Sequence, residues 1–536
     1  MPLLHWLTRD KDIHAASETP YRLLEEVREL SCGERDKANM LIQGDNLDAL
    51  KALLPYYAGK VKCVFIDPPY NTGSASFEYY DDNLKHAQWL AMMYPRLELL
   101  KELLSPDGFF CCQIDDAEGP YLKVVLDEIF GRNNFCSTLF IQVRYAEKTL
   151  KQDMDFHKQI EQIFVYKNSR MAKPVLPQKT TSFEKFCHSI TVKKPFSVID
   201  LGGKKVEIFN SENYEIKKGD GSQTGLKEIW ATGTILDGNS SGRFFRDYLS
   251  GRYNDDGLNV LYRVYGIGDD VLPYRYFTGP KRAGATKGKY FQGVPQDKLD
   301  NDNSSTTGPI ENYYDFSGAF GNCRHEGGVD FRSGKKPEIL LNLILGRFSS
   351  PNDLVLDSFL GSGTTAAVAH KMGRRYIGIE MGDHAMTHCA PRLQKVIEGE
   401  QGGISEAVGW KGGGGFRFYR LGVPVFDESG HVAPEIRFAP LAAHLWFLET
   451  GIPYSGNADS PLLGSHEGTG YYLLYNGILG DKRPEGGNVL STKVLACLPP
   501  HDGPKVIFGE GCLLSDERLK SREIMFRQIP YDIKAR

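Results

Sequence analysis

Asp67-Pro68-Pro69-Tyr70 directly follows an apolar run at 61–66 and combines residue types that could activate an amino group. The amino nitrogen of adenine or cytosine is a poor nucleophile because its lone pair is delocalised into the ring. The Asp67 carboxylate and the Pro68 carbonyl could each accept one N–H and so aim that lone pair at an electrophilic methyl group. The proline rings fix the backbone that carries these acceptors. Tyr70 offers a flat face for the base.

The same tetrapeptide could instead be only a turn that ends a strand, because its residue types also favour turns. A motif this short should arise by chance in roughly one chain in a few hundred of this length. Its place after a predicted buried strand favours the chemical interpretation, and a second motif downstream strengthens it.

That second motif, DSFLGSGTT at 357–365, follows another predicted strand and opens a helix. Its glycines would let the backbone approach a ligand, and the helix N-terminus would present N–H groups to it. Glu380, at the end of the next predicted strand, could bind both hydroxyls of a ribose. The order predicts a pocket for a nucleoside-type cofactor. A plain tight turn is one alternative, and an NAD pocket is a weaker one because Ala366 stands where a third glycine would be needed.

Alternating strands and helices surround both motifs. Strands are predicted at 40–43, 61–66, 109–114, 354–356 and 376–379, and helices at 21–30, 46–54, 88–104, 121–129, 336–348 and 364–372. Such alternation is typical of a doubly wound, mostly parallel α/β sheet. The blocks at roughly 1–135 and 331–400 are therefore predicted to be two halves of one sheet.

Between these halves the pattern changes to polar, aromatic and lysine-rich segments, which predicts an inserted domain at 136–330. The glycine-rich segment 401–415 predicts a flexible linker. Residues 416–536 would form a C-terminal α+β domain, with strand-like segments at 471–475, 494–497 and 505–508, and this domain is a candidate for binding a partner.

The overall composition is that of an ordinary soluble protein of two or three domains, with 536 residues, 41% hydrophobic and 25% charged. A net charge of -4 gives no global sign of a polyanion partner, so any nucleic-acid surface must be local. The ten cysteines include no CxxC pair, which argues against a zinc ribbon or a disulfide scaffold. The first 16 residues contain no long apolar stretch, so we expect no signal peptide, no membrane span and a cytoplasmic location.

Two basic stretches in the inserted region could supply the local surface. Residues 142–205 contain 13 Lys and Arg against 6 Asp and Glu, although this stretch alone could be only a solvated face. The second, 272–295, has no acid; its basic residues are Arg275, Lys281, Arg282, Lys287 and Lys289. They alternate with Tyr274, Tyr276, Phe277, Tyr290 and Phe291, which could be ordinary core aromatics. Beside a base-modifying site, contact with DNA phosphates is the favoured interpretation.

DPPYNTG at 67–73 with FLGSGTT at 359–365 resembles the β class of amino-methyltransferases, in which the catalytic motif precedes the target recognition domain and the S-adenosylmethionine loop follows it. The segments 44–47, 276–282, 335–338 and 526–531 are similar to the modification (Mod) subunits of type III restriction–modification systems. The resemblance spans nearly the whole chain. It implies a circularly permuted, Rossmann-like methyltransferase sheet with an inserted target recognition domain.

By this resemblance, Asp67, Pro68, Pro69 and Tyr70 are catalytic and no metal is needed. The residues implied to bind S-adenosylmethionine are Asp45, Lys336, Pro337, Asp357, Phe359, Gly361, Ser362, Gly363, Thr364 and Glu380. Asp45 would lie near the adenine end of the cofactor, although it could equally cap the helix that follows. Lys336 and Pro337 would line the methionine side, although Lys336 could be a surface lysine.

The resemblance also implies the substrate and the partners. An Asp at the start of the first motif indicates adenine N6, because cytosine N4 enzymes of this type usually carry Ser there. Double-stranded DNA is the expected substrate, with the adenine flipped into the pocket around Tyr70. A homodimer and a separate restriction (helicase-nuclease) subunit are the expected protein partners. The alternatives are an RNA adenine methyltransferase and an inactive DNA-binding specificity subunit.

Overall fold

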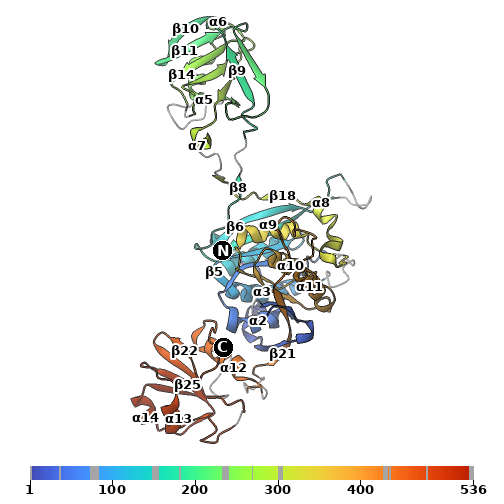
Figure 1. Ribbon diagram of the computed structural model, residues 1–536, viewed down its shortest axis with the longest axis vertical. Coiled ribbons are helices and arrows are strands. Elements are labelled where there is room, and N and C mark those ends of the chain that lie inside the picture. Colours follow the sequence, from blue (N-terminus) through green and yellow to red (C-terminus); the bar gives the residue numbers. More distant parts are fainter. Residues whose placement is uncertain are drawn as a thin grey trace. The chain divides into compact units, whose positions relative to one another are not determined.

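The computed structural model describes residues 3–35, 38–72, 84–147, 156–179, 183–231, 241–268, 270–299, 306–332, 334–426, 432–433, 436–478 and 481–529. Gly73, Pro530 and Tyr531, which belong to the segments quoted above, lie outside these residues. The chain forms two compact units, Met1–Val175 with Glu311–Arg536, and Leu176–Ile310. The second is the green unit in Figure 1.

One large sheet organises the first unit. In spatial order its strands are β1 (Arg22–Glu26), β21 (Gly415–Pro424), β3 (Ala38–Gln43), β20 (Arg375–Glu380), β19 (Leu354–Asp357), β4 (Val61–Ile66), β5 (Leu104–Ile114), β7 (Ile160–Lys167), β6 (Phe135–Gln142) and β18 (Tyr313–Asp315), and β2 (Cys32–Gly33) pairs with β21. Neighbours from β21 to β5 run parallel, whereas β7 is antiparallel to both β5 and β6. The predicted permuted Rossmann-like sheet is confirmed, because β4, which leads into the first motif, pairs in parallel with β19, which leads into the Gly loop.

Helices cover both faces of this sheet. They are α1 (Arg9–Glu18), α2 (Asn46–Tyr57), α3 (His86–Leu103), α4 (Gly119–Leu126), α8 (Ser317–Phe320), α9 (Glu338–Phe348), α10 (Thr364–Lys371) and α11 (Ala390–Ile397). Val64 and Phe110 point into the core shared with α2 and α3. Phe109 must point to the opposite face, since side chains alternate along a strand, and its ring lies 4.9 Å from that of Phe348 in α9. Burial on both faces explains why the central strands are almost continuous apolar runs.

The second unit is built around a separate six-stranded sheet. In spatial order its strands are β10 (Ser197–Leu201), β11 (Lys204–Phe209), β14 (Leu261–Tyr265), β15 (Tyr274–Thr278), β16 (Lys289–Gln292) and β13 (Lys227–Trp230). Two pairs, β9 (His188–Val192) with β12 (Tyr214–Lys218) and β8 (Gln178–Lys179) with β17 (Thr306–Thr307), and the helices α5 (Ser241–Phe244), α6 (Tyr253–Asp256) and α7 (Gln296–Leu299) complete it. The unit is shorter than the inserted domain expected at 136–330, because β6, β7 and β18 pair within the large sheet.

The C-terminal region begins inside the large sheet with β21 and continues into α12 (Phe438–Thr450). Its small sheet has the order β22 (Leu462–His466), β23 (Thr469–Leu473), β25 (Lys505–Gly509), β27 (Ile524–Gln528), beside α13 (Thr492–Cys497), α14 (Asp516–Ser521), β24 (Val489–Leu490) and β26 (Gly511–Cys512). It packs against α2 and the segment that precedes β1. The Tyr454 N–H donates to the Pro55 carbonyl of α2 at 2.8 Å, and the centres of the His444 and Tyr21 rings are 5.3 Å apart.

Three local predictions differ from the structure. Residues 21–30 form β1 and a short 3-10 helix, Arg28–Leu30, because β1 pairs with the distant β21. Residues 494–497 belong to α13, whose start is capped by the Ser491 side chain. The segment 401–415, expected to be a flexible linker, contains buried Ile404 and Ser405 and is tied to α11 by a hydrogen bond from Gly413 N–H to the Ile397 carbonyl.

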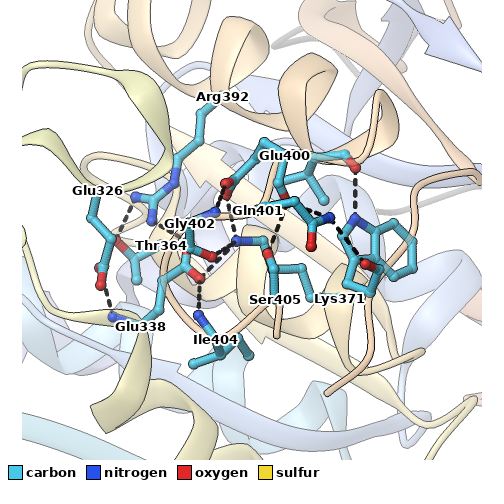
Figure 2. Close-up of polar contacts among 12 residues, drawn as sticks. Glu326, Glu338, Thr364, Lys371, Arg392, Glu400, Gln401, Gly402, Ile404 and Ser405 are labelled. Atoms are coloured by element: carbon cyan, nitrogen blue, oxygen red, sulfur yellow. Dashed lines mark hydrogen bonds and ion pairs between the residues drawn. The ribbon is translucent and has the colours of Figure 1, made fainter. Parts of the chain in front are cut away.

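A buried ion network holds the second half of the sheet together (Figure 2). Glu338, the first residue of α9, pairs with Lys371 of α10 at 2.8 Å and with Arg392 of α11 at 2.9 Å, and all three side chains are fully buried. Burial alone would raise the pKa of Glu338, but the two cations outweigh it and hold that pKa below its ordinary value. The network therefore fixes the starts and ends of three helices relative to one another.

Arg392→Met should lower the free energy of unfolding of this unit by about 3 kcal/mol or more, because it removes one partner of a buried carboxylate. Urea denaturation would measure the loss. Arg324→Met is the matched control, since Arg324 pairs with Asp330 where both side chains are about half exposed, and we expect little change there. Equal losses in the two variants would contradict the anchoring role of the network.

Candidate active site

The predicted site residues gather at one edge of the large sheet. β4 and β19 are parallel neighbours with Val64 opposite Leu356, so Asp67 and Phe359 each follow three residues later, at the same edge. The chain leaves β4 toward β5 on one side, and β19 toward β20 on the other. Ligands of open α/β sheets bind at such a switch point, beyond the carboxyl ends of the strands. Asp45 after β3 and Glu380 at the end of β20 lie along the same edge.

Asp67 is held from two sides. Its Oδ1 accepts a hydrogen bond from the Tyr70 hydroxyl at 2.7 Å, and its Oδ2 lies 2.7 Å from Nζ of Lys336. Lys336 is 8% exposed, so the alternative that it is a surface lysine is wrong. Burial raises the pKa of Asp67, and the charge of Lys336 opposes that rise. The lysine thus favours the ionised carboxylate that could accept an N–H.

The rest of the first motif is fixed by neighbouring elements. The indole N–H of Trp89, in α3, donates to the Pro69 carbonyl at 2.7 Å. The Tyr70 hydroxyl lies 2.8 Å from Oε2 of Glu161 in β7, and Nε2 of Gln113 in β5 donates to the same oxygen at 2.6 Å. Burial, followed by the two carboxylates, raises the pKa of Tyr70 well above its usual value, so the phenol stays protonated. Sequence reasoning missed Glu161 and Gln113.

The second motif forms a tight loop with one open side. Gly361 and Gly363 have φ of 56° and 80°, the left-handed region that glycine adopts without strain. A Cβ on Gly363 would come within 3.4 Å of Cys389, whereas one on Gly361 would meet nothing closer than 4.0 Å. Backbone therefore faces open space at Gly361, which is what close approach of a ligand requires.

Carboxylates and a hydroxyl border this loop. Asp357 is buried and accepts hydrogen bonds from Phe359 N–H at 2.9 Å and from the Thr365 hydroxyl at 2.6 Å. Oε2 of Glu380 accepts from Gly361 N–H at 2.7 Å. The buried Ser358 hydroxyl has no hydrogen-bond partner among the described residues. These acceptors and the Ser358 hydroxyl fit a ligand that carries hydroxyl and amino groups, such as a nucleoside-type cofactor.

A sequence model of the family described as DNA methylase matches residues 61–390, from the start of β4 to the start of α11. The chain belongs to this family. A Haemophilus influenzae protein named "Probable type III restriction-modification enzyme HindVI Mod subunit" is 34% identical over 414 residues, which cover 72% of this chain and 54% of that protein. The StyLTI Mod subunit of Salmonella typhimurium is 28% identical over 365 residues, 62% of this chain and 50% of the relative.

A shorter match, 35% identical over 167 residues, joins 25% of this chain to 26% of the EcoPI Mod subunit of Escherichia phage P1. The chain thus spans about half, or less, of the length of these curated relatives. The similarity to Mod subunits that the motifs predict is confirmed. No helix in the described part of this family member is long and apolar enough to cross a membrane.

Asp45 has a structural partner at each oxygen. Its carboxylate caps α2 by accepting from Leu47 N–H at 2.8 Å, as the alternative interpretation expected, and it forms an ion pair with Arg96 at 2.9 Å. Its side chain is still 42% exposed. Contact with a cofactor stays a prediction for Asp45.

The five basic residues predicted to contact DNA differ in their exposure. Arg275 is 4% exposed and pairs with Asp270 at 2.6 Å, so its predicted contact with DNA is wrong and its role is structural. Lys289 pairs with Glu228 at 2.7 Å and lies 4.8 Å from the centre of the Trp230 ring. Lys281, Arg282 and Lys287 are exposed on the loop between β15 and β16. The aromatics Tyr276, Phe277 and Phe291 are buried core residues.

Asp357 should make the stability of the ligand-free fold depend on pH, because burial raises its pKa from 3.8 to about 7. A carboxyl with a raised pKa in the folded state adds stability below its unfolded pKa, and that stability is lost as the pH rises through about 7. The difference is on the order of 4 kcal/mol. We expect Asp357→Asn to flatten the dependence of the unfolding free energy between pH 5 and pH 8 in urea titrations, with partly exposed Asp353→Asn as control. An unchanged slope in Asp357→Asn would contradict this assignment.

Proposed function

We propose that this chain transfers a methyl group from S-adenosylmethionine to the N6 amino group of an adenine flipped out of DNA. The observation that carries the proposal is the position of Asp67. Lys336 and Tyr70 hold its carboxylate at the sheet edge that it shares with the Gly loop after β19. An N–H acceptor and a cofactor loop on adjacent strands are the two parts that amino-group methylation requires.

The chain's own residues orient the amino group. Asp67 and the Pro68 carbonyl would each accept one N–H, which draws the nitrogen toward tetrahedral geometry and directs its lone pair. Trp89 fixes the Pro69 carbonyl, and so the proline backbone, before any substrate arrives. Acceptors that are already in place need no reorganisation in the transition state. The Tyr70 ring supplies a stacking face for the base.

The cofactor would be held by the Gly loop and its neighbours. When bound, it supplies an electrophilic methyl group. Phe359, Gly361, Ser362, Gly363 and Thr364 would line it with backbone, and the Asp357, Glu380 and Asp45 carboxylates would face its polar groups. Pro337 and Lys336 would lie at the end nearest Asp67. The open side of Gly361 supports this placement, as does the Ser358 hydroxyl, for which the described part of the chain offers no partner.

Adenine in DNA is the favoured substrate because Asp, and not Ser, begins the first motif and because the relatives are named as Mod subunits. The second unit, Leu176–Ile310, would read the sequence, with Lys281, Arg282, Lys287 and Lys289 on phosphates. We further propose that the chain acts as a homodimeric modification subunit with a separate restriction subunit. Single-molecule sequencing of DNA from cells that express the chain should show N6-methyladenine in one sequence motif. Methyl transfer to RNA and not to DNA would overturn the substrate assignment.

Asp67→Ala should reduce methyl transfer by about 100-fold or more, because it removes a preorganised acceptor for the amino group. Its affinity for S-adenosylmethionine should stay within about twofold of the wild type. Transfer of a radiolabelled methyl group to duplex DNA measures the first quantity, and calorimetry the second. An active Asp67→Ala enzyme would remove Asp67 from the mechanism.

Lys336→Met should move the acidic limb of the pH profile of kcat to higher pH. The Lys336 charge opposes the rise that burial gives to the pKa of Asp67, so its removal lets that pKa rise further. Because the carboxylate form accepts the N–H, activity is then lost at a higher pH, with a shift of about one unit or more. Exposed Lys411→Met is the control. If the acidic limb of Lys336→Met lies at the same pH as that of the wild type, the proposed charge effect is excluded.

A further inference from the structure

Three oxygens form a line beside the proposed reaction centre. Oδ1 of Asp67 lies 2.7 Å from the Tyr70 hydroxyl oxygen, which lies 2.8 Å from Oε2 of Glu161. Both separations are hydrogen-bond distances between oxygens, and each such contact requires one proton. A phenol carries only one. With both carboxylates ionised, one of the two contacts would bring two oxygens together with no proton between them.

The line must therefore hold a second, shared proton. Tyr70 keeps its own, because burial and the neighbouring carboxylates hold the pKa of its phenol well above the usual value. The extra proton can thus lie at the Asp67 end or at the Glu161 end. Lys336 lies 2.7 Å from Asp67 but 4.0 Å from Glu161, so its charge acts more strongly on Asp67 and opposes the rise that burial gives to the pKa of that carboxyl.

The Glu161 carboxyl is held opposite Tyr70 and is partly exposed. Gln113, which is fully buried, donates Nε2 to Oε2 of Glu161 at 2.6 Å and fixes that oxygen opposite Tyr70. The Glu161 side chain is 18% exposed, which leaves it a route to water. Among the described residues, Lys336, Asp67 and Asp115 are charged groups near it, and Asp115 lies 3.7 Å from Lys158.

We propose that Glu161 accepts, through the Tyr70 hydroxyl, the proton that the adenine amino group loses during methyl transfer. This proposal rests on the function proposed above. The N6 lone pair forms the new N–C bond, and the electron pair of the broken C–S bond stays on sulfur. The amino nitrogen then passes one proton to Asp67. Tyr70 takes that proton and gives its own to Glu161 in the same step in which one proton leaves Glu161 for water, so the three groups return to their resting protonation.

Single and double substitutions test this relay. Glu161→Gln keeps the side-chain shape but cannot take the proton, and Tyr70→Phe keeps the stacking ring but removes the hydroxyl. We expect each to lower kcat by about 10-fold or more, within the range that general acid–base groups contribute. The double variant should be no slower than the slower single variant, because both interrupt one line. The wild-type solvent isotope effect on single-turnover transfer should be reduced in both variants.

Two further measurements separate a relay from a structural role. The affinity for S-adenosylmethionine and the midpoint of unfolding should both stay at wild-type values in Glu161→Gln, and Glu398→Gln, at an exposed position after α11, is the matched control for all assays. Wild-type kcat in Glu161→Gln, or additive losses in the double variant, would overturn the relay alone while the wild type still methylates DNA. Absence of methyl transfer by the wild type would overturn both the proposed function and the relay.

Discussion

The geometry of the site depends on the ion pairs that the fully buried Glu338 carboxylate forms with Lys371 and Arg392. Arg392, one of its two ion-pair partners, also donates to the Thr364 hydroxyl at 2.7 Å, and that hydroxyl donates to the Lys336 carbonyl at 3.1 Å. The Gly loop and the lysine that pairs with Asp67 therefore share one anchor. A displacement of this anchor would move the Gly loop and the lysine beside Asp67 together.

Burying three charges is costly, and a well-packed apolar cluster could give similar stability. The charged groups also set orientation, because each hydrogen bond fixes both the orientation of a helix end and its distance from the neighbouring helix. Lys371 extends the same network to Glu400, and Glu338 also accepts from Ile404 N–H at 3.1 Å. The segment 399–405 is thereby fixed to α9 and α10, although its glycines suggested a loose connection.

Local sequence signals were sufficient for the central strands and for both motifs. Apolar runs such as 61–66 and the turns that follow them depend on residues close in sequence, and the parallel pairing of β4 with β19 then brings Asp67 to the Gly loop. Glu161 could not be found in this way, because it is 91 residues from Tyr70 and nothing in its sequence neighbourhood distinguishes it from a surface acid. Arg275 was misjudged for the same reason. The basic, acid-free stretch 272–295 suggested that Arg275 contacts phosphate. Only the fold reveals the buried Asp270 beside it.

The insertion of β21 between β1 and β3 has a consequence for how the chain folds. Residues 415–424 pair with β1 on one side and with β3 on the other. During synthesis, therefore, β3 remains an unpaired edge until more than 370 further residues have been made. Pairing over such a separation closes a long loop and is intrinsically slow. The nascent N-terminal half thus carries an open strand that could pair with another chain, and protection of that edge depends on completing translation past residue 424.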